Sequence, residues 1–230
     1  MHNQQMMKSN VNMKSILSKM NEILAIGDSY QAPDRVLQVV TSTDREERNR
    51  IYNQLADLFD NDYSKDWFFE YFQEEHADRH QNKQDFTPPC IASIIHHVLR
   101  EGYHTEERPD GKRVTYDPAA GTGQLLIRDW WLTRKKFMPW EYRPIDHLIV
   151  CSELSVKTVP FLLLNLAVRG MCGMVFHMNT MTKEVYAVYV ICNPDNNPCG
   201  FSDVRLMEHF EPEQTEEQVK QQVPEQLSLF

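Results

Sequence analysis

The chain has 230 residues, of which 41% are hydrophobic and 25% charged, and its formal net charge is −9. This composition supports one globular domain of ordinary size, and the absence of an apolar run near ~20 residues excludes a membrane-spanning protein. The acidic balance excludes an unaided, nonspecific nucleic-acid binder, because such proteins cluster Lys and Arg. The polar N-terminus lacks the apolar core of a secretory signal, so we expect a cytoplasmic protein.

The cysteines number five and include no Cys-x-x-Cys pair. An odd set without metal-ligand spacing predicts neither a disulfide framework nor a zinc site. We therefore expect reduced, buried thiols and no bound metal.

Three parts follow one another along the chain. Residues 1–84 carry apolar side chains at helical spacing, such as Ile16, Met20 and Leu24, and predict a helical N-terminal extension. Residues 85–205 alternate between helical and strand patterns, which predicts an α/β domain with right-handed crossovers and a mainly parallel sheet. Residues 206–230 are rich in Glu, Gln and Pro and predict a disordered acidic tail.

The helix and strand patterns of the middle part are each bounded by turn or capping residues. In chain order we predict a helix opening at Thr87-Pro88-Pro89, a strand 114–116 ending at Asp117, a helix 124–136, a strand 148–151 ending at Glu153, a helix 155–169 ending at Gly170, a strand 174–176 before Asn179, and a strand 185–192.

A glycine turn joins the first of these strands to the helix that follows it. Gly121 and Gly123 permit sharp backbone turns and close approach of a ligand, and the first N–H groups of the helix point back at the turn. By itself this pattern also describes an ordinary structural strand-to-helix turn. The acid-proline pair Asp117-Pro118 before it and the second acid, Glu153, after the next strand favour a cofactor-binding loop.

Polar residues end all four predicted strands: Asp117, Glu153, Asn179 and Asn193. Ligands of open α/β sheets lie beyond the carboxyl ends of the strands, so we expect these groups to converge there. A carboxylate after the second strand suits ribose hydroxyls, and an amide after the third suits an adenine edge. Because Asp117 would repel a pyrophosphate, the pattern favours a cofactor with a positive end, S-adenosyl-L-methionine, over NAD or ATP.

Four motifs in this order resemble those of N6-adenine DNA methyltransferases, and most of all the modification subunit of type I restriction systems. They are Phe86-Thr87-Pro88-Pro89, Asp117-Pro118-Ala119-Ala120-Gly121-Thr122-Gly123, Glu153 with the later Asn165-Leu166-Ala167-Val168-Arg169-Gly170, and Asn179-Thr180-Met181. The resemblance spans residues 67–193. It implies DNA as substrate and a Rossmann-like class I S-adenosylmethionine-dependent methyltransferase fold, here truncated after the fourth strand, with a helical N-terminal extension.

The resemblance also implies roles for individual residues. Thr87 and Pro88 would border the methionine part of the cofactor. The loop with Asp117, Pro118, Ala119, Gly121 and Gly123 would hold its amino-acid end. Glu153 would bind the ribose and Asn179 the adenine. Asn193 and the Pro194 carbonyl would accept hydrogen bonds from the target amino group.

The chain departs from that family at the catalytic motif. The family has Asn-Pro-Pro followed by an aromatic residue that stacks on the extruded base, whereas this chain has Asn193-Pro194-Asp195-Asn196. Phe201 would replace the ring if the loop folded back. The alternative is a plain turn from Asn193 to Gly200, since Asn, Pro, Asp and Gly are typical turn residues.

Little apolar sequence follows Cys199, and no target-recognition domain is present. Two explanations stay open. In the first, a partner subunit completes the sheet and supplies the DNA contacts. In the second, the chain is a catalytically weak or inactive binding protein, of phage or other mobile-element origin, that uses the fold as a scaffold.

The last five residues, Gln226-Leu227-Ser228-Leu229-Phe230, resemble the short peptide by which bacterial proteins dock on the replication sliding clamp. Leu229 and Phe230 would anchor in an apolar pocket, assisted by Leu227, and Gln226 would add a directional amide. The sequence therefore predicts the sliding clamp as a partner. The alternative is a tail that packs on its own domain or on an oligomeric partner.

Overall fold

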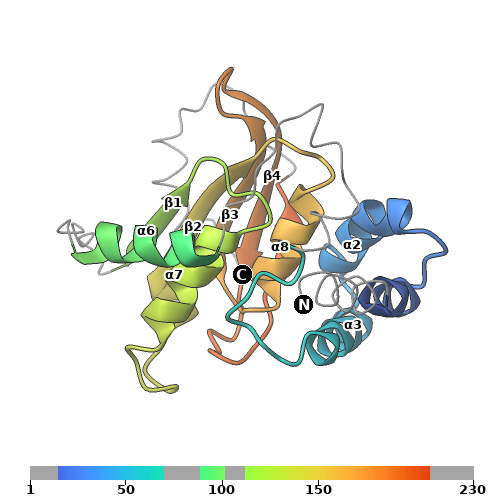
Figure 1. Cartoon of the computed structure of the whole chain (residues 1–230), viewed down its shortest axis with the longest axis horizontal. Coiled ribbons are helices and arrows are strands. Elements are labelled where there is room, and N and C mark those ends of the chain that lie inside the picture. The colour runs from blue at the N-terminus through green and yellow to red at the C-terminus, as the bar shows by residue number, and fades with distance from the viewer. Residues whose placement is uncertain (1–14, 70–88, 102–111, 208–230) are drawn as a thin grey trace, which may run out of the picture.

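The computed structural model describes residues 15–69, 89–101 and 112–207 of the chain. These residues form one five-stranded sheet with helices packed against one face (Figure 1). The strands are β1 (Arg113–Asp117), β2 (His147–Glu153), β3 (Cys172–Asn179), β4 (Glu184–Cys192) and β5 (Asp203–Leu206), and they lie in that order across the sheet. The predicted α/β class is confirmed, with one short strand more than the four expected.

The sheet is mixed, which corrects the expectation of a mainly parallel one. Strands β1, β2 and β3 are parallel, whereas β4 runs antiparallel to β3 and β5 antiparallel to β4. Only four residues separate β3 from β4. Parallel strands need a crossover of about a dozen residues or more, so this connection closes a hairpin.

The helices come from both parts of the chain. Residues 15–24 are helical, and the named elements are η1 (Ser29–Gln31), α2 (Ala32–Val40), α3 (Arg45–Leu58), α6 (Pro89–Glu101), α7 (Gln124–Arg134), η2 (Pro144–Asp146) and α8 (Val159–Ala167). The predicted helix 155–169 is therefore shorter at both ends. Among the helices of the described segments, none has the length and apolar character needed to cross a bilayer.

Helix α8 occupies the centre of the main core. Every residue of this helix is buried, because one side meets the sheet and the other packs against α2. The core cluster continues from Met20 in the N-terminal helices to Val204 in β5. A second buried cluster, with Leu148, Val150 and Met174, lies on the other face of the sheet. The N-terminal helices thus share one core with the sheet.

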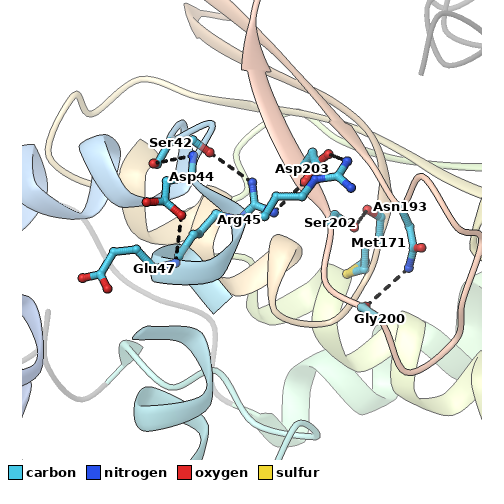
Figure 2. A network of polar contacts seen from close by, with 10 residues as sticks. Ser42, Asp44, Arg45, Glu47, Met171, Asn193, Gly200, Ser202 and Asp203 are labelled. Carbon is cyan, nitrogen blue, oxygen red and sulfur yellow. Dashed lines mark hydrogen bonds and ion pairs between the residues drawn. The ribbon is translucent and has the colours of Figure 1, made fainter. Parts of the chain in front are cut away.

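A buried ion pair joins α3 to the last strand (Figure 2). The Arg48 guanidinium lies 2.6 Å from Asp203 Oδ1, and Arg45 contacts the other oxygen of the same carboxylate. Helix α3 begins at a side-chain cap, in which Asp44 accepts the N–H of Glu47 at 3.1 Å. Residues more than 150 positions apart in the sequence are therefore held together at this point.

Candidate functional site

The glycine turn lies where β1 gives way to α7, as predicted. Gly121 and Gly123 have φ angles of 57° and 100°, values at which a side chain is strained. A Cβ on Gly123 would also lie 3.0 Å from Leu162 Cδ1 of α8. Gly123 begins the helix without a side-chain cap, so backbone N–H groups of the turn are the donors at this end of α7.

Glu153 closes over this turn from the end of β2. Its Oε2 accepts the N–H of Gly121 at 2.9 Å, and its Oε1 accepts the N–H of Ser155 at 2.8 Å. Burial raises the pKa of the Glu153 carboxyl, and these backbone hydrogen bonds act in the opposite direction. The two acids that the sequence singled out thus lie at neighbouring strand ends, since β1 and β2 are parallel partners.

Asp117 is the least satisfied polar group of this edge. Its Oδ1 accepts the N–H of Ala119 at 3.1 Å, whereas the buried Oδ2 has no hydrogen-bond partner among the described residues. Burial raises the pKa of the Asp117 carboxyl, against the lowering effect of the Ala119 hydrogen bond. A buried carboxylate gains most from a cationic or hydrogen-bond-donating ligand, so this oxygen has the chemistry to accept one.

Thr122 in the middle of the turn is anchored by a residue that sequence reasoning missed. Its hydroxyl donates to Asp66 Oδ2, and Asn165 Nδ2 of α8 donates to Asp66 Oδ1 and to the Thr122 carbonyl, both at 2.8 Å. Burial raises the pKa of the Asp66 carboxyl, while these hydrogen bonds and the nearby Arg169 lower it. Asp66 lies 56 positions before Thr122, and no local pattern marks it.

Asn179 and His177 complete the carboxyl edge on β3. The Asn179 side-chain oxygen accepts the N–H groups of Met181 and Thr182 at 3.0 and 3.2 Å, which stabilises the hairpin turn. His177 pairs with Glu153 across the β2–β3 ladder, and burial lowers the pKa of its imidazole. His177 was not predicted as a site residue, although its place near the end of the third strand was a usable signal.

Asn193 lies at the opposite edge of the sheet, so the expected convergence of four polar groups is wrong for this residue. Because β4 runs antiparallel, its last residues pair with the start of β3, and Ile191 faces Gly173. The Asn193 N–H donates to Cys172 Sγ at 3.2 Å. Catalysis by Asn193 and Pro194 next to Asp117 is a prediction that this arrangement does not support.

The side chain of Asn193 organises a turn, which was the alternative interpretation. Its Nδ2 donates to the carbonyls of Asn197 at 2.7 Å and, at longer range, Gly170, and its Oδ1 accepts the Asn197 N–H at 3.0 Å. Nδ2 also donates at 3.4 Å to the Gly200 carbonyl (Figure 2). Phe201 packs edge-on against Tyr52 in the core, with ring centroids 5.3 Å apart. It is therefore not positioned to stack on a base at the glycine turn.

Replacing Asn193 with alanine should lower the free energy of unfolding by about 1–3 kcal/mol, because buried groups of the turn lose their partners. Ligand affinity at the glycine turn should change less than about twofold, since the residue is at the other end of the sheet. Urea unfolding and a ligand titration at a temperature where the variant is folded measure the two quantities. A marked loss of affinity without a stability change would contradict this placement.

Several predicted residues lie outside the described part of the chain. They are Thr87 and Pro88, which precede α6 in the sequence, and the C-terminal set Gln226, Leu227, Leu229 and Phe230. Pro118 and Ala119 are described and are exposed at the start of the turn.

A protein-family model matches most of the chain. The family model for N-6 DNA methylases matches residues 56–223, which include the last three residues of α3, the whole sheet and both acids of the candidate site. Searches of the curated proteins and of the solved structures each found no match. With the match covering well over half of its length, the chain belongs to the N-6 DNA methylase family.

Proposed function

We propose that the carboxyl edge of β1 and β2 binds S-adenosyl-L-methionine, and that the protein takes part in DNA adenine N6 methylation as the cofactor-binding chain. The observation that carries the proposal is the buried Asp117 Oδ2, which no group in the described segments contacts by a hydrogen bond, beside a glycine turn that Glu153 holds. Family membership supports a DNA methylase in general. The adenine target and the identity of the cofactor go beyond what family membership shows, and both are proposed here.

The residues at this edge fit the proposed cofactor. Asp117 Oδ2 would accept the cationic amino group, for which a buried carboxylate is a suitable partner. Glu153 retains lone pairs for ribose hydroxyls, since each oxygen accepts one backbone N–H. The amide oxygen of Asn179 is used by the hairpin turn, so its amide nitrogen would meet the adenine. When bound, the cofactor supplies an electrophilic methyl group.

A second candidate function is favoured by the position of Asn193. With this amide in a turn at the opposite edge, the described residues place no Asn-Pro pair at the glycine turn. The chain would then bind the cofactor without transferring its methyl group, unless a partner subunit supplies the missing groups and the DNA contacts.

Two measurements on the full-length protein separate these candidates. Isothermal titration with S-adenosylmethionine tests the site, and incorporation of labelled methyl groups into unmethylated DNA tests the transfer, with Asp117→Asn as the control. If the wild type forms N6-methyladenine and Asp117→Asn does not, the result supports a methyl-transferring enzyme. Cofactor binding without incorporation supports the second candidate, and failure to bind the cofactor refutes both.

The C-terminal residues support a separate proposal, docking on the bacterial sliding clamp. It rests on the sequence Gln226-Leu227-Ser228-Leu229-Phe230, where two anchoring apolar residues follow a polar tail. The double variant Leu229→Ala/Phe230→Ala should lose capture of purified clamp in a pull-down, since anchors dominate such contacts. Ser228→Ala is the matched control and should still capture the clamp. Equal recovery of both variants would remove the proposal.

A further inference from the structure

A cleft of about 510 Å³ opens at the edge of the sheet opposite the glycine turn. The end of α7 forms one wall, and the loop after β4 and the end of α8 form the other. The lining residues used below are Trp130, Trp131, Arg134, Lys135, Phe137 and Cys199. The volume lies within the range of small-ligand sites, about 300–1,000 Å³. The position separates this cleft from the proposed cofactor site, because the glycine turn caps the first residue of α7 whereas the cleft is lined by the last turn of the same helix.

The charge of the cleft is opposite to that of the chain. The whole chain carries a net charge of −9, yet the described residues that line the cleft include Arg134, Lys135 and Arg169 and no Asp or Glu. Neither Arg134 nor Lys135 forms an ion pair with a carboxylate of the described residues. Cations clustered without neighbouring acids attract an anionic ligand.

The cations lie on aromatic rings, which adds a second recognition element. The Lys135 ammonium is 4.9 Å from the centroid of the Trp131 ring, and the Arg134 guanidinium is 5.4 Å from that of Trp130. Arg134 also lies 3.6 Å from Cys199 Sγ, on the facing wall. Phe137 adds a ring that is 39% exposed. Trp130 is buried and Trp131 is partly buried against the core, so Trp131 and Phe137 are the rings with surface left for a ligand. Accessible ring surface beside positive charges is the combination that holds a base by stacking and its phosphate by charge.

We propose that this cleft binds single-stranded nucleic acid, with a base against Trp131 and the adjoining phosphates at Lys135 and Arg134. The proposal is independent of the cofactor site and of methyl transfer. It explains why the basic end of α7 faces a cleft lined by aromatic rings. Arg169 contributes to the wall only, because its guanidinium donates to the carbonyls of Tyr63, Lys65 and Asn165.

Fluorescence anisotropy with a labelled single-stranded oligonucleotide tests the proposal on the full-length protein without cofactor. Lys135→Glu should weaken binding about tenfold, and two phosphate contacts predict a slope of about −1.4 for log K against log salt concentration. The matched control is Lys136→Glu, an exposed neighbour outside the lining, which should change binding less than about twofold.

Stacking is tested by a second matched pair. Trp131→Leu should weaken binding by about 5- to 150-fold, whereas Trp140→Leu, 78% exposed and outside the lining, should not. Circular dichroism and unfolding curves confirm that each variant is folded.

Equal losses from Lys135→Glu and Lys136→Glu, or no binding by the wild type, would overturn the proposal. So would equally tight binding of adenosine monophosphate, which would identify a free nucleotide as the ligand.

Discussion

Replacing Asp117 with asparagine should strongly weaken binding of S-adenosylmethionine and at the same time stabilise the ligand-free protein. The substitution keeps the oxygen that accepts the Ala119 N–H and removes the charge from the buried Oδ2, which has no hydrogen-bond partner in the part of the chain that the structure describes. Loss of one partner of a buried charged hydrogen bond costs about 2–5 kcal/mol, which is a loss of affinity of roughly 30- to 5,000-fold. Isothermal titration measures it.

The gain in stability follows from the direction of the pKa shift. Because burial raises the pKa of Asp117 in the folded protein, its contribution to stability is present below the ordinary pKa of aspartate. That contribution is lost as the pH rises through the raised value. Asp117→Asn should therefore be more stable than the wild type at pH 7, by about 1 kcal/mol or roughly 2–4 °C in Tm. The difference should vanish in acid.

The control for this experiment is Asp195→Asn, which neutralises an exposed carboxylate in the turn at the other edge of the sheet. It should change neither the affinity nor the pH profile. In the wild type, the affinity should fall as acid protonates Asp117, and the fall should begin above the ordinary pKa of aspartate. An Asp117→Asn variant that binds the cofactor normally would refute the site.

Replacing Asp66 with alanine should destabilise the protein by about 3–5 kcal/mol, the range for removing one member of a buried charged network. The substitution removes the acceptor of the Thr122 hydroxyl, the Asn165 amide and the Phe68 N–H, which lies 3.0 Å from Asp66 Oδ1. It also takes from the buried Arg169 the carboxylate that stabilises its charge most, so that Asp62 is the remaining aspartate acting on it among the described residues. Urea unfolding measures the effect, and cofactor affinity should fall because the glycine turn loses its anchor.

Asp62→Ala is the matched control, since it removes an aspartate from the same segment. Asp62 pairs at 2.7 Å with Lys65, whose side chain is 76% exposed. Asp62 also accepts the N–H and the hydroxyl of Ser64. An exposed ion pair contributes about 0–1 kcal/mol and a partly buried hydrogen bond about 1 kcal/mol, so the control should lose about 1–2 kcal/mol, less than Asp66→Ala. If the two variants lost equal stability, the anchoring role of Asp66 would be wrong.

The hairpin between β3 and β4 shows how far the chain itself predicts topology. The sequence pattern predicted both strands and the polar residues at their ends. The four residues between β3 and β4 are too few for a parallel crossover. The antiparallel direction therefore follows from connection length. The expectation that Asn193 joins Asp117 treated the fourth strand as parallel, and the short connection contradicts it.

The sequence by itself determined the features made by neighbouring residues: the glycine turn, the acids that end β1 and β2, the turn chemistry of Asn193, and family membership. These depend on local backbone preferences and on apolar periodicity. Only the tertiary structure decided which distant groups meet. Asp66 under Thr122, Arg48 on Asp203, and the cleft between α7 and the loop after β4 each join segments whose spacing in the chain carries no signal. The physical reason is that packing of the shared core brings these segments together, and core packing depends on all of the helices and strands at once.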